Sequence, residues 1–189
     1  MKRPISLYII IFLLSLIISY HIYYAFHNNM DYEVEEIIKN VKEKKNNSTK
    51  FVENNLQEEH YIGVLEIPKI NLRKGFYDVT SKNNNVNKNI YVLPSSKMPN
   101  ISASTLIIAA HSGNSYVGYF KELKKLEMDD EIRIYYNNIL YTYYVDNYYE
   151  IPKIGKITFE KSENSSIIVL TTCSDNNKQL IVTAKLKQI

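Results

Sequence analysis

Cysteine is almost absent from this sequence. The 189 residues contain one cysteine, Cys173, and no tryptophan. A single cysteine cannot form a disulfide within the chain. It is either a small apolar residue that packs in the core or a reactive nucleophile. Its position at the end of an apolar run leaves both readings open.

The chain also lacks a large net charge of either sign. Its 23 Lys and Arg residues against 20 Asp and Glu residues give a formal net charge of +3. Nucleic-acid-binding domains usually concentrate positive charge in a patch or stripe, so no nucleic-acid partner is expected. The length and the 45% hydrophobic content fit one domain with an appendage.

Formal charge is missing altogether from residues 5–26, ISLYIIIFLLSLIISYHIYYAF, which follow Lys2 and Arg3. About 20 apolar residues can cross a bilayer as a helix, and positive flanks tend to stay in the cytoplasm. No convincing cleavage site for a signal peptide follows. The sequence predicts an uncleaved single-pass membrane anchor, with residues 1–4 cytoplasmic and the remainder outside the cell. A buried helix is the alternative.

A charged segment separates this stretch from the folded domain. Residues 31–59 contain no Gly or Pro, and residues 27–59 are predicted to be a stalk, either helical or flexible. Apolar residues recur in it at helical spacing: Val34, Ile37, Ile38 and Val41.

The folded domain, residues 60–189, consists mostly of short apolar or alternating runs, which predict an all-β barrel or sandwich. The expected elements are two strands around Pro68 in residues 61–72, a buried strand over 104–111, one short helix or turn in 119–126, a hairpin over 131–151 that turns at Asn137 and Asn138, and two strands flanking Cys173.

Two reactive residues stand at strand ends. His111 closes the apolar run 104–111 before the loop SGNSYVG, and Cys173 closes SIIVLTTC before a polar turn. Catalytic groups commonly sit where a rigid sheet meets its loops. An imidazolium near a thiol lowers the pKa of the thiol and favours the nucleophilic thiolate. The two residues are a candidate catalytic pair, provided that the fold brings them together.

A third group usually stabilises the oxyanion that forms when a thiolate attacks a carbonyl. Arginine suits this role, but no arginine follows Cys173. The nearby candidates are Lys178 and Gln179. Because side chains alternate along a strand, only one of the two can face Cys173.

Three segments resemble the sortase family. TLIIAAHSGNSYVGYFKELKKLEMDDEI is similar to the histidine segment of the family, with its F-x-x-L-x-x-L run. IIVLTTCSDNNKQLIV resembles the cysteine segment, and YIGVLEIPKINL resembles the opening strands. The segments follow the family's order, and the resemblance extends from about Tyr61 to Leu186.

The resemblance implies a closed eight-stranded β-barrel with one or two short helices, preceded by a transmembrane helix, on a Gram-positive-type cell surface. It also implies a cysteine transpeptidase that cleaves exported proteins at a C-terminal LPxTG-type sorting signal. Cys173 would form a thioester, and His111 would protonate the leaving amine. An amine of a peptidoglycan precursor or a pilin would then resolve the thioester. Substrate contacts are expected from Thr171, Thr172 and Ser112.

One motif departs from the family pattern. Gln179 occupies the position where sortases typically carry an arginine, with Lys178 just before it. A slower enzyme is one consequence, and a domain that binds sorting signals without turnover is the alternative. A plain structural barrel with an inert cysteine is a second alternative.

The loop lengths bear on the sortase class. The segment between Tyr149 and Ile167 is too short for the insertion of class B, and no class C lid is evident upstream, so a class A-like or unassigned type is expected. No cofactor or metal is expected, although an acidic cluster could bind Ca²⁺: Glu127, Asp129, Asp130 and Glu131.

Overall fold

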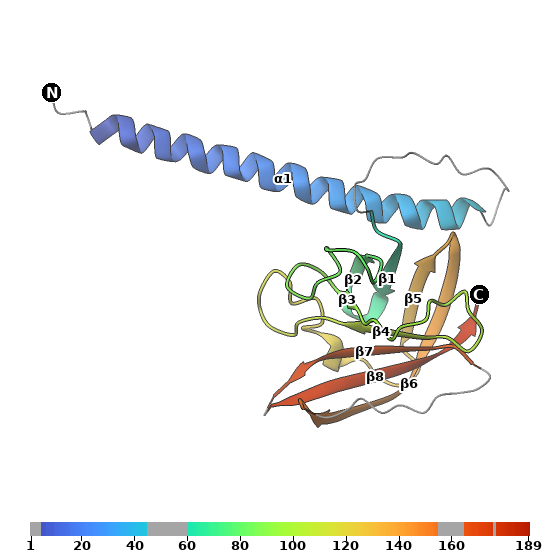
Figure 1. The fold of residues 1–189 in the computed structure, drawn as a ribbon. Helices are drawn as coiled ribbons and strands as arrows, with labels where there is room; N and C mark the ends of the chain where they lie inside the picture. Colours follow the sequence, from blue (N-terminus) through green and yellow to red (C-terminus); the bar gives the residue numbers. More distant parts are fainter. Residues whose placement is uncertain (1–4, 45–59, 155–164, 176) are drawn as a thin grey trace.

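The computed structural model describes residues 5–44, 60–154, 165–175 and 177–189. It contains one long helix and an eight-stranded sheet (Figure 1). The elements are α1 (Ile5–Lys44), β1 (Gly63–Ile67), the 3-10 turn η1 (Pro68–Ile70), β2 (Leu72–Phe76), β3 (Tyr91–Val92), β4 (Thr105–Ala109), the 3-10 turn η2 (Leu123–Lys125), β5 (Glu131–Tyr136), β6 (Ile139–Pro152), β7 (Ile167–Ser174) and β8 (Lys178–Gln188).

The sheet curls into a nearly closed barrel. Its strand order is β2-β1-β5-β6-β8-β7-β4-β3, so β2 and β3 are the two end strands. Between these ends, the Asn89 side-chain amide just before β3 donates from Nδ2 to the carbonyl of Gly75 in β2 at 2.9 Å. The predicted eight-stranded all-β fold is therefore confirmed, with a barrel that is nearly rather than fully closed.

Local sequence signals account for two of the turns. Pro68 follows β1 and begins η1, and Asn71 then adopts a left-handed conformation with φ of 50° before β2. Asn137 and Asn138 have φ of 51° and 58°, the positive pair that a two-residue type I′ hairpin requires and that Asn tolerates. Both features agree with the sequence prediction.

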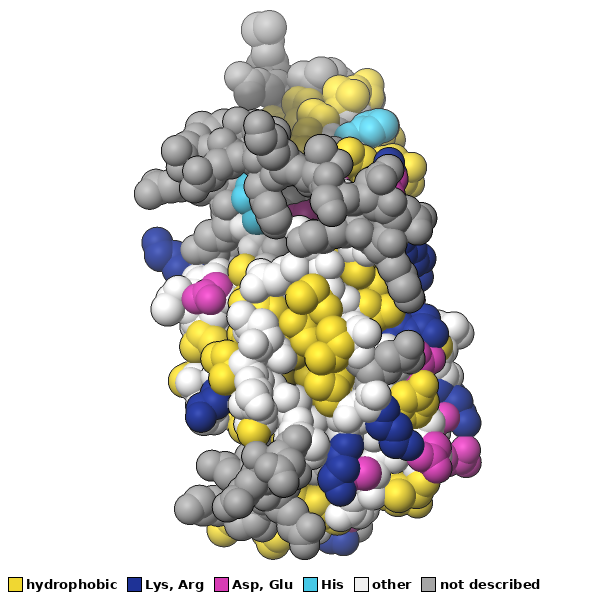
Figure 2. Space-filling view, turned by 90° about the vertical axis from the view of Figure 1, so that its right-hand side faces the viewer, with side chains coloured by type: hydrophobic (Ala, Val, Ile, Leu, Met, Phe, Trp, Pro, Cys, Tyr) yellow, Lys and Arg dark blue, Asp and Glu magenta, His cyan; other side chains and the backbone are white. Residues whose placement is uncertain are grey.

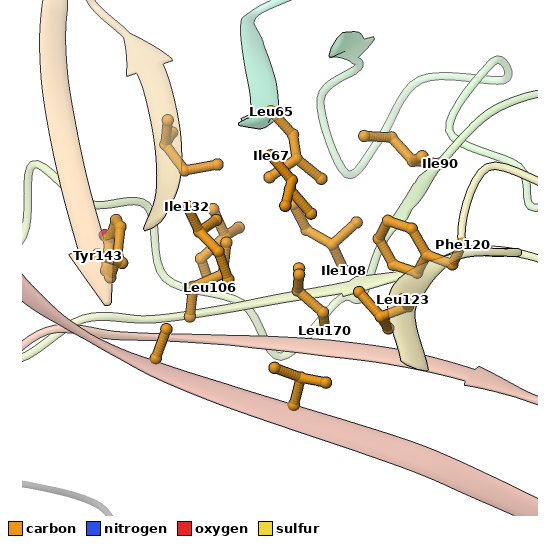
Figure 3. Packing of buried hydrophobic residues seen from close by; sticks show 14 of the residues in the cluster. Leu65, Ile67, Ile90, Leu106, Ile108, Phe120, Leu123, Ile132, Tyr143 and Leu170 are labelled. Carbon is orange, nitrogen blue, oxygen red and sulfur yellow. The ribbon is translucent and has the colours of Figure 1, made fainter. Parts of the chain in front are cut away.

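Aliphatic and aromatic side chains fill the inside of the barrel. Leu106 and Ile108 of β4, Leu170 of β7 and Ile134 of β5 are fully buried. Figure 3 shows Phe120 close to Ile108 and Leu170, from the segment that leads into η2. The predicted helical turn is thus anchored in the core by its apolar residues.

Helix α1 has two dissimilar halves. Its C-terminal half lies against β1, β2 and β5, where Val34, Ile38 and Val41 pack with Tyr61 and Val64. Part of the predicted stalk is therefore helical and docked on the barrel (Figure 1). Residues 45–59 of that stalk lie outside the described residues. The N-terminal half exposes large apolar side chains between Tyr8 and Tyr24.

No membrane-crossing helix is identified by length and hydropathy in the described part of the chain. The transmembrane span expected over residues 5–26 is therefore not supported by the structure.

A buried carboxylate lies at the centre of a cluster of side chains that links helix α1 to the sheet. Glu66 of β1 accepts hydrogen bonds from Arg73 (Nη2, 2.8 Å), Arg133 (Nη1, 3.3 Å) and the hydroxyl of Tyr135 (2.8 Å). Burial alone would raise the pKa of Glu66, but these donors outweigh it and hold its pKa below the ordinary value. Arg73 also pairs with Glu35 of α1, so the cluster ties the helix to the sheet.

Charges of the two signs lie side by side on the barrel surface. Figure 2 shows dark-blue basic and magenta acidic side chains next to one another on one face. Specific examples are the pairs Lys178–Glu150 and Lys185–Asp146, at 3.0 Å and 2.9 Å. Such mixing gives no concentrated basic footprint for nucleic acid on this face.

Candidate active site

The ends of β4 and β7 bring the two reactive residues to one edge of the sheet. These strands run parallel, with Ala109 opposite Thr171. The alignment continues past the ladder, because Ala110 donates from its backbone nitrogen to the Thr171 carbonyl at 3.2 Å. His111 follows Ala109 by two residues, and Cys173 follows Thr171 by two residues. The parallel register therefore places both at the same end of adjacent strands.

Cys173 is exposed. It is the penultimate residue of β7 and follows the buried Thr171 and Thr172. The interpretation of this cysteine as a packed core residue is therefore wrong, while its reactivity stays a prediction. An accessible thiol on a rigid strand is placed to react with a ligand from outside the barrel.

His111 is held by a partner that the sequence analysis missed. Its Nε2 lies 3.1 Å from Oδ1 of Asn87, which belongs to the connection between β2 and β3. Because the amide oxygen only accepts hydrogen bonds, it assigns a proton to Nε2 and leaves Nδ1 for exchange with a ligand. On the backbone side, Phe120 donates to the His111 carbonyl at 3.0 Å.

The loop that carries Asn87 is itself fixed by asparagine side chains. Asn85 Oδ1 accepts from the backbone of Asn87 at 2.9 Å. Nearby, Asn84 exchanges two hydrogen bonds with the backbone of Val92, at 2.9 Å and 2.7 Å. The position of Asn87 is thus set by an internally bonded loop. In the sequence this loop shows only as a run rich in Asn, which is typical of turns.

Gln179 is the residue that faces Cys173 across β7 and β8. The two are opposite each other in the antiparallel ladder, so their side chains share one face of the sheet. Gln179 donates from Nε2 to Oγ1 of Thr171 at 2.6 Å. This amide nitrogen carries two hydrogens, so one remains for a ligand near the thiol.

Lys178 lies on the other face. It is opposite Ser174, and its Nζ is 3.0 Å from Oε2 of Glu150. Glu150 also accepts a hydrogen bond from the Ser174 hydroxyl. Hydrogen bonds from Ser174 and Lys178 lower the pKa of Glu150. The structure therefore brings Gln179, and not Lys178, to the face of Cys173.

The predicted substrate-contact residues divide between two sides of the thiol. Thr171 is buried and lies on the face shared with Gln179. Thr172 lies on the opposite face and donates from Oγ1 to the Ala110 carbonyl at 2.7 Å, which closes the gap between the strand ends. Ser112, directly after His111, lines a small cavity together with Thr172 and Cys173.

This cavity has a volume of about 120 Å³. The β7–β8 turn contributes Asp175, and the segment around η2 contributes Lys121 and Lys124. Ser112 brings the loop after His111 to the same cavity as the Cys173 thiol, while His111 itself is not a lining residue. Neither lysine stands out in the sequence.

The acidic residues 127–131 are engaged with basic side chains. Lys69 Nζ lies 3.0 Å from Glu127 and 3.6 Å from Asp130, and Asp129 pairs with Lys187 at 3.4 Å. Across the described ranges, no group of three or more His, Cys, Asp or Glu residues is arranged to hold a metal ion. The absence of a metal or cofactor requirement stays a prediction.

Comparisons with known proteins agree on one family. The family model described as the sortase domain matches residues 65–187. No curated protein matches the sequence. Sortase C1 from Streptococcus agalactiae matches with a TM-score of 0.63 and 21% identity, covering 87% of this chain and 98% of that chain. Sortase A from Corynebacterium diphtheriae, a lid mutant, matches with a TM-score of 0.62 and 18% identity, covering 82% and 94%.

A third match is a sortase C from Clostridium perfringens, whose structure is described as including the C-terminal cell wall sorting motif. It has a TM-score of 0.60 and 22% identity, and covers 92% of this chain and 100% of that chain. Since both sortase A and sortase C structures match at similar levels, the likeness shows the fold and leaves the predicted class untested. The family-model match, which spans most of the barrel, shows that this chain belongs to the sortase family.

Proposed function

We propose that this protein is a cysteine transpeptidase that acts on exported proteins with an LPxTG-like C-terminal sorting signal. The observation that carries the proposal is the parallel register of β4 and β7, which sets His111 and the exposed Cys173 at one edge. Sortase family membership agrees with it. The sorting motif described for the Clostridium perfringens structure supports this substrate class.

In the proposed reaction the Cys173 thiolate attacks the carbonyl carbon of the scissile peptide bond. The C–N bond breaks, a thioester forms, and His111 gives a proton to the leaving amine. Asn87 keeps Nε2 protonated, so Nδ1 is the nitrogen that carries the transferred proton. An amine of a peptidoglycan precursor or a pilin then attacks the thioester, returns its proton to His111 and releases Cys173.

Gln179 would supply the hydrogen bond to the oxyanion. Its amide nitrogen is already oriented by Thr171, and Gln179 lies opposite Cys173 in the β7–β8 ladder. A neutral amide stabilises a developing negative charge less than a guanidinium does. The chemical step should therefore be slower than in a relative with arginine at this position.

Attachment to a cell membrane through the N-terminal part of α1 is part of the proposal. That part carries large apolar side chains, such as Ile11, Phe12 and Leu16, that are more than half exposed. Contiguous exposed apolar surface usually marks an interaction site. Sedimentation of membranes from cells that express the full chain tests this point, since a protein found only in the soluble fraction would contradict it.

The central experiment looks for the acyl-enzyme. The full chain, purified in mild detergent, is incubated with LPxTG-type peptides and examined by intact mass. We expect an adduct that matches the acyl part of the peptide and is absent from Cys173→Ala. Retention of the barrel in Cys173→Ala, checked by circular dichroism, makes it a matched control.

The replacement of arginine by Gln179 favours a second candidate function, binding of sorting signals without turnover. In that case the peptides would bind with measurable affinity, but no adduct would form even though Cys173 reacts with iodoacetamide. An adduct that forms and is transferred to an amine would rule out the second candidate.

A further inference from the structure

The cavity beside Cys173 is positively charged on one wall. Lys121 and Lys124 line it from the segment around η2, while Asp175 is its acidic lining residue. Neither lysine takes part in an ion pair among the described residues, whereas the neighbouring Lys125 pairs with Glu122 at 2.7 Å. The lining therefore carries a net positive charge next to a nucleophile.

The core fixes this arrangement. Phe120 and Leu123 are fully buried and point into the barrel in Figure 3. Lys121 and Lys124 each follow one of these anchors, at a spacing of three residues. In a 3-10 turn, residues three apart lie on the same side. The apolar residues of the F-x-x-L run thus hold both lysines on one side, at the cavity.

Ser112, the residue that follows His111, lines the cavity together with Cys173, whereas Gln179, the proposed oxyanion donor, does not line it. An amine that leaves or attacks the thioester must exchange its proton with His111, and by microscopic reversibility both amines use the same place. The cavity is therefore positioned for the amine partner and not for the acyl part of the substrate.

We infer that Lys121 and Lys124 bind a carboxylate of the amine partner, so that the preferred acyl acceptor is an amine with a carboxylate a few bonds away, as in an amino acid or a peptide terminus. This inference rests on the proposed transpeptidase function. In the step concerned, the acceptor nitrogen forms a bond to the thioester carbonyl carbon and the C–S bond breaks. Cys173 leaves as the thiolate, and the amine proton goes to His111.

The first test needs no transpeptidase activity. Cys173 is alkylated with iodoacetate, which carries a carboxylate, and with neutral iodoacetamide. We expect the ratio of the iodoacetate rate to the iodoacetamide rate to fall about fivefold in the double variant Lys121→Gln/Lys124→Gln. This is the effect of losing one close contact between opposite charges in water. Lys125→Gln, which removes a charge outside the cavity lining, should leave the ratio unchanged. A rise in salt should lower the ratio in the wild type.

The second test uses the acyl-enzyme with glycine and glycinamide as acceptors. We expect the double variant to lose the preference for glycine by a similar factor. The ratio of the glycine rate to the glycinamide rate is compared between the wild type and the double variant. The different basicity of the two amines then cancels.

The outcomes separate the two proposals. If no acyl-enzyme forms but the alkylation ratio shifts, the transpeptidase function fails and the carboxylate site stands. If acyl transfer proceeds with the same acceptor ratio in both proteins, and alkylation is also unaffected, the carboxylate site is overturned and the function stands.

Discussion

Cys173 and Gln179 face each other across the β7–β8 ladder, and the Gln179 amide is bonded to Thr171 at 2.6 Å. The group opposite the thiol is therefore neutral and is held by a neighbouring hydroxyl. In the family pattern that this sequence resembles, a permanently charged arginine stands at this position. The presence of a neutral amide in place of a guanidinium should lower the rate of acyl-enzyme formation.

Gln179→Arg is expected to speed acyl-enzyme formation about tenfold, because a charged donor stabilises the oxyanion better than an amide. Gln179→Ala should slow it by at least about tenfold, since the loss of one oxyanion donor is costly. Single-turnover intact-mass kinetics with one peptide measures both. Lys178→Gln should change the rate less than twofold, because Lys178 faces Glu150. Equal rates in all four proteins would remove Gln179 from the mechanism.

Asn87→Ala is expected to lower the transfer rate about tenfold. The Asn87 side-chain oxygen holds Nε2 of His111 at 3.1 Å, so its loss removes the contact that orients the imidazole. Asn87→Asp should restore part of the rate, because a carboxylate can accept the same hydrogen bond. Single-turnover transfer kinetics with one acceptor amine measures the three proteins.

The control for Asn87 is Lys88→Ala, which changes the exposed neighbouring residue. An equal rate loss in Asn87→Ala and Asn87→Asp would mean that Asn87 only shapes the loop and does not orient His111.

Glu66→Gln is expected to destabilise the barrel by about 3 kcal/mol at neutral pH, because it breaks a buried, paired carboxylate. The pKa of Glu66 is lowered below its ordinary value of 4.5. A depressed carboxyl pKa stabilises the fold fully above the unfolded value, and this contribution is lost as pH falls through the folded value. The stability gap between the two proteins should thus be constant above pH 4.5 and narrow below it. Urea unfolding at several pH values measures the gap, and a gap independent of pH would contradict the assignment.

Ile38→Ala is expected to destabilise the docked half of α1 by about 3 kcal/mol, as a large buried side chain is truncated. Ile38 is 2% exposed and packs on the β1–β2–β5 side of the barrel. Differential scanning calorimetry should report a lower melting temperature, whereas Glu36→Ala on the exposed side should melt like the wild type. Peptide acylation at 25 °C should persist in both, because the Cys173 edge belongs to β4, β7 and β8.

The sequence predicted those parts of the molecule that depend on local patterns. Pro68 and the Asn137–Asn138 pair mark turns through their own backbone preferences, and alternating apolar residues mark the strands around them. His111 and Cys173 were each singled out because they close an apolar run, but their placement at one edge depends on the parallel register of β4 and β7. The signals for the turns and strands lie within a few residues of one another, so they can be read without knowing the fold.

The remaining features depend on contacts between distant segments. Asn87 is one of several asparagines in its loop, and only the folded chain selects it as the partner of His111. Val34, Ile38 and Val41 pack on the barrel, but a free helical stalk would show the same spacing of apolar residues. The spacing alone therefore does not reveal the docking. In the sequence, Lys121 and Lys124 resemble ordinary surface charges. Only the folded chain places them beside the β7–β8 turn.

The parallel pair β4–β7 joins two segments that lie far apart in the sequence. Residues 110 and 171 are bonded across a long stretch of chain, and β7 is flanked by β8, the last strand to be synthesised. Contacts so distant in sequence form late in folding. Before β8 is added to the sheet, the Cys173 thiol lies on β7, which then has only β4 as a neighbouring strand. We therefore expect the Cys173 thiol to lack its facing residue Gln179 until the eleven-residue strand β8 has joined the sheet.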